Sequence, residues 1–154
     1  MHTNISELRV SGILVLLILL CAKTFSQEIF NSPVTIMFYN TGNFFHPSDD
    51  PLTDDDEFTP DGVMRWTESR YRKKISAVYR AIVAAGGWSP PSVVAFCEVE
   101  SRKVLDDLIY DTYLSKYNYS VIHRDSPDRR GIDVCLIYRK DILDVLSYSW
   151  HYLK

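Results

Sequence analysis

The sequence predicts an α/β fold whose sheet begins parallel and turns antiparallel toward the C-terminus. Two apolar segments rich in β-branched and aromatic residues, 34–40 and 92–100, have the composition of buried strands. Amphipathic helical patterns precede and follow the second segment. Two more strand segments, 119–123 and 133–139, are joined by a turn alone. Strands joined by helices are typical of parallel α/β units, whereas strands joined by a turn pair antiparallel.

The helix ends are marked by capping residues. Thr67 is a candidate N-cap for the first helix, and the glycine pair at 86–87 ends it. The second helix is predicted to start after Ser101 and to run to about Lys116. The last segment, 141–154, keeps strand character and is expected to add a further strand.

The N-terminal segment has the features of a secretory signal peptide. Its apolar run, residues 12–22, is too short to span a bilayer comfortably, follows Arg9 and leads to small residues ending at Ser26. We therefore predict a signal peptide over residues 1–26, a mature domain over 27–154, and a secreted or periplasmic protein without stable membrane insertion after cleavage. An uncleaved N-terminal anchor is the alternative.

Composition limits the class of protein. The chain has 154 residues, 46% of them hydrophobic, and a net charge of −3 at pH 7, which suits one globular domain at most. An acidic chain does not bind polyanions by bulk charge, so nucleic-acid binding would need a local basic patch or metal ions. Cys97 and Cys135 lie in apolar runs and are expected to be free buried thiols rather than a disulfide.

Both predicted inner strands end on a side chain that carries oxygen. Asn40 closes the first strand and Glu98 closes the second. The carboxyl ends of parallel strands meet at one edge of a sheet, where ligands of α/β proteins bind. A carboxylate and an amide oxygen suit Mg²⁺, which completes its octahedron with water and phosphate. The alternatives are a turn residue at Asn40 and a capping or surface charge at Glu98.

The turn before the last internal strand offers further candidates. Arg130, beside Gly131, is the preferred phosphate-binding residue. Asp133 begins the strand and could orient a catalytic histidine or merely start the sheet. The alternative for the arginine is a solvated ion pair. His123 is interpreted as structural.

Two charged runs are interpreted as solvated. The acidic run 49–57 lies in a long polar loop, 41–61, and lacks the spacing of a Ca²⁺-binding loop. Arg72, Lys73 and Lys74 lie on a helix whose other face is apolar, so we expect them to face water.

Four segments in order resemble the endonuclease/exonuclease/phosphatase superfamily, which has the fold of pancreatic deoxyribonuclease. They are MFYNTGNFF (37–45), the insert-like DEFTPDGVMRWTESRYRKK (56–74), VVAFCEVES (93–101) and HRDSPDRRGIDVCLIYR (123–139). The resemblance implies the N-terminal half of a four-layer α/β/β/α sandwich with mixed sheets, of the secreted bacterial type.

The resemblance also implies an activity and a site. The activity is metal-dependent hydrolysis of a phosphoester by a nuclease, phosphatase or phosphodiesterase with Mg²⁺ or Mn²⁺. Asn40 and Glu98 correspond to the family's metal site and thereby to its catalytic residues, while Arg130 and Asp133 lie where substrate binds. The substrate, which includes nucleic acid among the possibilities, stays open.

Later family motifs, an Asp-x-Asn pair and a closing Asp-His pair, are not found after Arg139. We therefore expect the general-base histidine and the C-terminal half of the domain to lie downstream, and this chain alone to be inactive with apolar sheet surface uncovered. A non-catalytic secreted binding or interaction module, built on a degenerate half-domain, is the alternative function.

Overall fold

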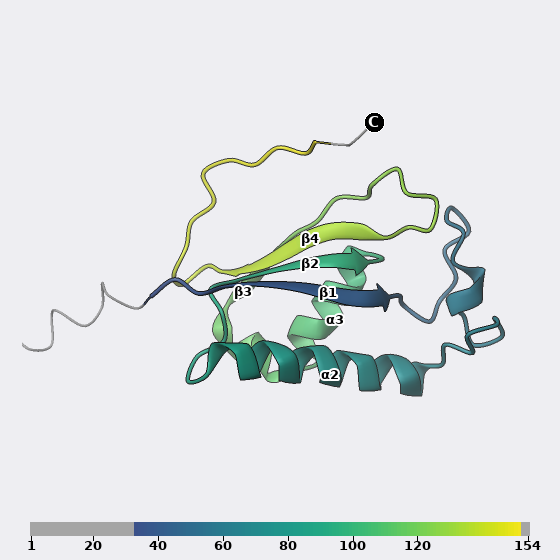
Figure 1. Cartoon of the computed structure of the whole chain (residues 1–154), viewed down its shortest axis with the longest axis horizontal. Helices are drawn as coiled ribbons and strands as arrows, with labels where there is room; N and C mark the ends of the chain where they lie inside the picture. Colours follow the sequence, from purple (N-terminus) through teal and green to yellow (C-terminus); the bar gives the residue numbers. More distant parts are fainter. Residues whose placement is uncertain (1–32, 152–154) are drawn as a thin grey trace, which may run out of the picture. The chain divides into compact units, whose positions relative to one another are not determined.

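A computed structural model of the chain describes residues 33–151, and the predicted signal peptide lies outside this range. The described part contains one four-stranded sheet with both α-helices on the same face (Figure 1). Within residues 33–151, no helix has the length and apolar character needed to cross a membrane. The elements are β1 (Ile36–Phe44), η1 (Asp56–Phe58), α2 (Glu68–Gly86), β2 (Val93–Val99), α3 (Arg102–Tyr110), η2 (Tyr113–Tyr117), β3 (Tyr119–Ile122) and β4 (Asp133–Arg139).

The sheet has the strand order β1-β2-β4-β3 and confirms the predicted α/β class. The α2 crossover makes β1 and β2 parallel, with Ile36 opposite Val93 and Asn40 opposite Cys97. The other two pairings, β2 with β4 and β3 with β4, are antiparallel. The helix layer and this sheet correspond to two of the four layers that the resemblance implies.

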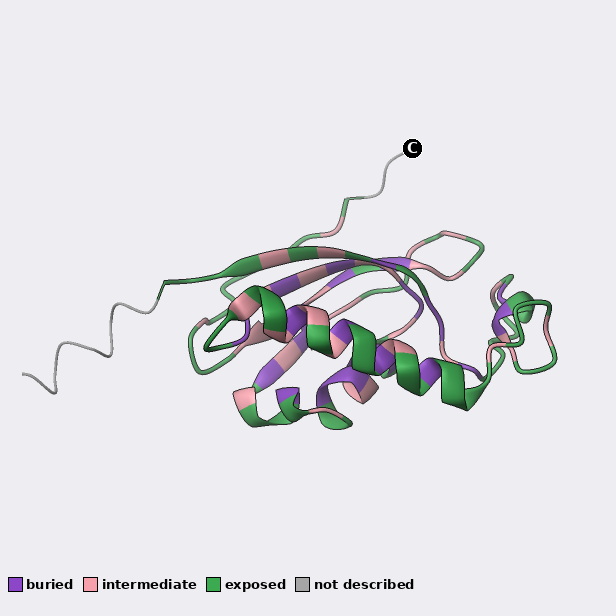
Figure 2. Ribbon diagram, turned by 60° about the horizontal axis from the view of Figure 1, so that its bottom comes forward, coloured by how far each residue is buried: buried purple, intermediate pink, exposed green. Residues whose placement is uncertain are grey.

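The core lies between the sheet and the two helices. Phe96 and Ile137, from neighbouring strands, are fully buried and face Tyr71 of α2 and Leu105 of α3, which are also fully buried. Figure 2 shows the buried stripe along each helix on the side that faces the sheet. The helical spacing of apolar residues therefore predicted the packing faces correctly.

The opposite face of the sheet carries exposed apolar side chains. Ile36 and Phe38 of β1 are 71% and 69% exposed, and Val134 of β4 is 59% exposed. Single exposed apolar residues are ordinary, but three on one face of the sheet, on β1 and β4 with β2 between them, form a patch. This agrees with the expectation that apolar sheet surface is uncovered in the described residues.

Cys97 and Cys135 are free thiols, as predicted, but Cys97 is only partly buried. Cys135 is buried, and burial raises the pKa of its thiol to about 12. Burial also raises the pKa of Cys97. Both groups are therefore protonated and poorly nucleophilic at neutral pH.

Three predicted boundaries differ from the structure. The first strand continues to Phe44 rather than ending at Asn40. The second helix ends at Tyr110, because the Thr112 hydroxyl donates to the Leu108 carbonyl and also accepts from the Leu114 amide, which starts η2. The prediction of a strand from residue 141 onward is wrong for 141–151, which have no regular structure, because no neighbouring strand in the described chain pairs with them.

Candidate functional site

The ends of β1 and β2 bring Asn40 and Glu98 together, as predicted. The Asn40 Nδ2 donates to Glu98 Oε1 over 3.1 Å, across a sequence separation of 58 residues. The contact follows from the parallel pairing, in which Asn40 lies opposite Cys97, the residue before Glu98. Asn40 is exposed and Glu98 is partly exposed, so the pair is open to solvent. We call this pair the strand-end site.

Glu98 occupies a β-bulge with a left-handed backbone. Cys97 pairs with Val134 and Val99 pairs with Asp133, so Glu98 has no opposite residue on β4. Its φ is 62°, a conformation that costs a non-glycine residue on the order of 1–3 kcal/mol. Bulges of this kind redirect a side chain and are frequent beside active sites. The strain is therefore an indication of function that the sequence did not reveal.

The segment that follows Asn40 holds the carboxylate in place. The Asn43 amide donates to Glu98 Oε2 over 3.0 Å, and the Gly42 amide donates to Asn40 Oδ1 over 2.8 Å. Both residues have positive φ, 58° at Asn43 and 64° at Gly42. Each Glu98 oxygen thus accepts one hydrogen bond and keeps a lone pair for a further ligand.

The Thr41 side chain links the end of β1 to the end of β2. This residue is buried, and its hydroxyl is 2.8 Å from the Cys97 carbonyl and 2.9 Å from the Glu98 carbonyl. A hydroxyl has one hydrogen, so the bond is shared between the two carbonyls. The contact satisfies backbone carbonyls at the bulge.

Lys74 contacts the same backbone segment, in contrast to the prediction that it faces water. Its ammonium donates to the Thr41 carbonyl and, over 3.0 Å, to the Gly42 carbonyl. Burial lowers the pKa of Lys74, while the charge of Glu98 acts in the opposite direction. The helical period could have revealed this inward position. Lys74 follows Tyr71 by three residues and directly precedes Ile75, and both of these residues are buried.

The donor set of the strand-end site suits a hard divalent cation. A carboxylate and an amide oxygen are available at the surface. Mg²⁺ and Mn²⁺ prefer such oxygen ligands and keep several waters, which the exposed position allows. The residues present therefore fit the metal that the resemblance implies.

Arg130 lies near the strand-end site but is held by its own turn. Its guanidinium binds Asp128 through two contacts, Nη2 to Oδ2 at 2.9 Å and Nε to Oδ1 at 3.2 Å. Asp128 is the main cause of the raised pKa of Arg130, and the charge of Glu98 also contributes. The side chain is 63% exposed, so it is accessible to a phosphate group.

Gly131 allows the turn to approach the long loop. Its φ is 67°, and a Cβ at this position would lie 2.7 Å from the Thr53 methyl carbon. A larger residue would therefore push the turn that carries Arg130 away from the loop.

Asp133 is buried and binds groups of its own hairpin. Its Oδ2 is 2.9 Å from His123 Nε2, and its Oδ1 accepts from the Ser126 amide over 2.7 Å. Only 2% of its side chain is exposed, so direct substrate contact is not supported by this geometry. The arrangement favours the structural interpretation of His123 and lets Asp133 fix the turn that carries Arg130. With Asp125, these two residues also form a group with ligand spacing for a metal.

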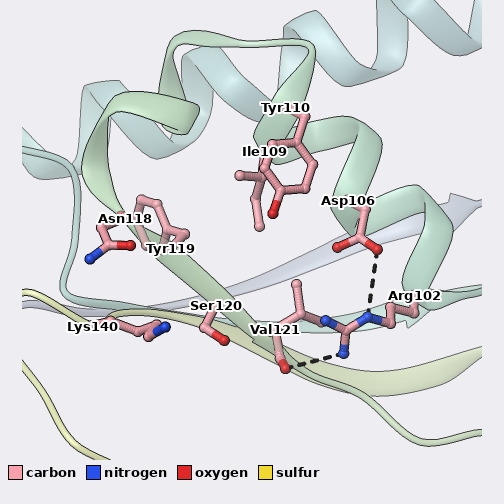
Figure 3. A pocket seen from close by; sticks show the side chains of 9 residues that line it. All are labelled: Arg102, Asp106, Ile109, Tyr110, Asn118, Tyr119, Ser120, Val121 and Lys140. Atoms are coloured by element: carbon pink, nitrogen blue, oxygen red, sulfur yellow. Dashed lines mark hydrogen bonds and ion pairs between the residues drawn. The ribbon is translucent and has the colours of Figure 1, made fainter.

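A shallow polar pocket of about 180 Å³ lies between α3 and the edge strand β3 (Figure 3). Arg102 spans it, pairing with Asp106 and contacting the Val121 carbonyl. None of the predicted site residues lines this pocket. It is therefore separate from the strand-end site.

A protein-family model described as "Endonuclease/Exonuclease/phosphatase family" matches residues 35–153. No curated protein and no solved structure matches the chain. The matched range contains both strand ends, the helix that carries Lys74 and the turn that carries Arg130, so it spans every residue predicted for the site.

Proposed function

The chain belongs to the endonuclease/exonuclease/phosphatase family, and we propose that it acts as a divalent-metal-dependent phosphoester hydrolase through the strand-end site. The observation that carries this proposal is Glu98, a partly exposed carboxylate in a strained bulge, hydrogen-bonded to Asn40 on the neighbouring strand. Members of this family generally depend on divalent metals. Mg²⁺ or Mn²⁺ is the proposed ion.

The proposed roles follow from the contacts. Glu98 supplies the anionic oxygen that a divalent cation requires, and Asn40 orients that carboxylate while its own oxygen keeps a lone pair. When bound, the metal would act as a Lewis acid toward a phosphoryl oxygen. Arg130 would hold a second phosphate oxygen, exchanging part of its pairing with Asp128 for the substrate.

Lys74 is proposed as a positioning residue. It touches the carbonyls of Thr41 and Gly42, in the segment that presents the Asn43 amide to Glu98. Its positive charge therefore stabilises the conformation that holds the carboxylate. Within the described residues, Lys74 makes no hydrogen bond to the Glu98 carboxylate itself.

The water-activating base is proposed to come from a C-terminal half-domain. The histidines within residues 33–151 have other partners: His46 lies 3.9 Å from Asp107, His123 binds Asp133 and His151 lies near Ser149. The uncovered apolar face formed by Ile36, Phe38 and Val134 is where such a half-domain would pack.

The test is Glu98→Gln in the full-length protein, which removes the charge and keeps the shape. Hydrolysis of bis(p-nitrophenyl) phosphate and p-nitrophenyl phosphate would be measured against Mg²⁺ and Mn²⁺ concentration. We expect kcat/KM to fall by at least ~10²-fold, since even residues that only support a metal ligand are worth about 10–100-fold. Thermal melting should show that the variant folds.

Glu68→Gln is the matched control, because Glu68 is an exposed glutamate at the start of α2, paired with Arg72. It should leave turnover unchanged. Equal turnover and equal metal dependence in Glu98→Gln and wild type would contradict the proposal. If wild type itself shows no metal-dependent turnover, the open apolar face would favour the alternative, a non-catalytic interaction module.

A further inference from the structure

The acidic run 49–57 was expected to be solvated, but one of its carboxylates is buried. Asp55 is 1% exposed. Its Oδ2 accepts from the Asp50 amide at 3.3 Å, whereas its Oδ1 is buried without a hydrogen-bond partner in the described structure. A buried polar atom that makes no hydrogen bond costs on the order of 1–3 kcal/mol, and more when charged. This oxygen is therefore available to a ligand.

A second carboxylate lies beside it. Glu100 follows the end of β2 and is 8% exposed, and its side chain lies within hydrogen-bonding reach of Asp55. Glu100 Oε2 accepts from the His46 amide over 2.7 Å and lies 3.4 Å from the Ser101 hydroxyl. These contacts fix the position of Glu100 but bring no full positive charge.

The two carboxylates have no counter-charge from the described chain. None of the ion pairs within residues 33–151 includes Asp55 or Glu100. Both side chains are buried, so two carboxyl groups without a cationic partner in residues 33–151 lie where water has little access.

We propose that Asp55 and Glu100 bind a Ca²⁺ ion that fastens the long loop to the end of β2. The unpartnered Asp55 oxygen and the adjacent Glu100 carboxylate would be two of its ligands. Ca²⁺ accepts six to eight oxygen ligands in flexible geometry, including backbone carbonyls of a loop. Mg²⁺ loses its water reluctantly and demands a near-ideal octahedron, which two carboxylates in a dry site do not offer.

This calcium site is distinct from the strand-end site. Glu98 binds Asn40 and Asn43, and neither of these residues contacts Asp55 or Glu100 through its side chain. The calcium site would be structural. The loop returns to the chain at the turn of Arg130, where the Asp54 amide donates to the Arg129 carbonyl, so a fixed loop also fixes that turn.

The inference is tested by titrating the full-length protein with Ca²⁺ and measuring the binding by isothermal titration calorimetry. Wild type should bind one Ca²⁺ ion that Glu98→Gln retains, which separates this site from the proposed catalytic one. Asp55→Asn should weaken the binding at least about tenfold, because ligand charge tunes calcium affinity. Asp54→Asn is the matched control, since Asp54 is the neighbouring acid, 62% exposed and paired with Arg129, and it should bind as wild type does.

If Asp55→Asn does not fold, amide hydrogen exchange of the wild-type protein with and without Ca²⁺ provides the test instead. Calcium should slow amide exchange in residues 46–58 and leave α2 unchanged. The inference is overturned if wild type shows neither calcium binding nor this protection, or if Asp55→Asn binds calcium as tightly as wild type. It is also overturned if Asp55→Asn melts higher than wild type whether or not calcium is present, because the two carboxyl groups would then share a proton instead.

Discussion

The middle of β2 and its carboxyl end differ in what they contribute to the protein. Phe96 is fully buried between the sheet and the helices and has ordinary strand pairing, opposite Cys135. Glu98, two residues later, has left-handed backbone, lacks a partner on β4 and faces solvent. The first position stabilises the fold, whereas the second costs stability and presents a carboxylate.

The comparison shows how a strained residue is kept in place. Val99 is fully buried and resumes the pairing with β4 immediately after the bulge. Glu98 is therefore flanked along the chain by two buried core residues, Phe96 and Val99. Its backbone cannot leave the left-handed conformation without moving one of these side chains out of the core. Strained conformations persist only where the surroundings determine them in this way.

The largest expected effect belongs to the core. Phe96→Ala should lower the free energy of unfolding by about 3–5 kcal/mol, because it removes a fully buried ring and leaves a cavity. Urea denaturation followed by circular dichroism would measure it. A loss below about 1 kcal/mol would show that Phe96 does not pack as described.

Phe38→Ala is the matched control on the other face of the sheet. Phe38 is 69% exposed, so the free energy of unfolding should change by less than about 0.5 kcal/mol. Size-exclusion chromatography should show less self-association, since a large apolar side chain is removed from the exposed patch.

The next effect concerns the support of the strand-end site. Lys74→Met removes the ammonium from the Thr41 and Gly42 carbonyls but keeps the aliphatic stem. We expect metal-dependent kcat/KM to fall by about 10–100-fold, as for other groups that orient a metal ligand. The apparent affinity for Mg²⁺ should fall with it, which a purely structural role of Lys74 would not cause.

Lys73→Met is the control for this substitution, because Lys73 is exposed on the same helix. It should retain both kinetic constants. If the two variants behave alike, Lys74 has no special role at the site.

The sequence was sufficient for the fold because the core follows regular periods. The apolar positions of α2 and α3 recur at helical spacing, and the helix ends lie at the predicted Thr67, Gly87 and Ser101. The side chains of Thr67 and Ser101 make no capping hydrogen bond, so the two residues mark the helix starts without capping them. The C-terminal segment was mispredicted because its composition favours a strand, although a strand requires a neighbour to pair with.

The site was only partly predictable. Strand-end placement correctly brought Asn40 and Glu98 together, because parallel strands share one edge. The bulge at Glu98, the inward turn of Lys74 and the burial of Asp55 were missed. Each depends on tertiary contacts over more than thirty residues or on a backbone conformation that has no sequence period.

A smaller effect isolates the strain at residue 98. Glu98→Gly and Glu98→Ala both remove the carboxylate, but only alanine must keep a Cβ at φ 62°. We expect the glycine variant to be more stable than the alanine variant by about 1 kcal/mol. At an ordinary strand position glycine is less stable than alanine by roughly 0.5–1 kcal/mol, so the sign alone is decisive. Alanine as the more stable variant would mean that the bulge relaxes.

The smallest expected effect is a pH dependence of the free energy of unfolding that arises from His46, a residue that packs against the core at the start of the long loop. Its ring packs edge-on against Tyr71, with centroids 5.2 Å apart, and burial is the main cause of its lowered pKa, followed by the charge of Lys103. The folded protein therefore binds fewer protons at His46 than the unfolded chain, whose pKa is about 6.5. By linkage, the stability that His46 contributes is present above that pKa and is lost as the pH falls through the folded value.

His46→Gln removes this titration while keeping a polar side chain of similar length. The difference in free energy of unfolding between wild type and His46→Gln should shift against wild type as the pH is lowered from about 7.5 to about 5. Using the difference cancels groups common to both proteins, including Glu100, whose raised pKa acts with the opposite sign. A difference that stays constant over this range would show that His46 titrates alike in the folded and unfolded states, and that the core does not extend to the base of the long loop.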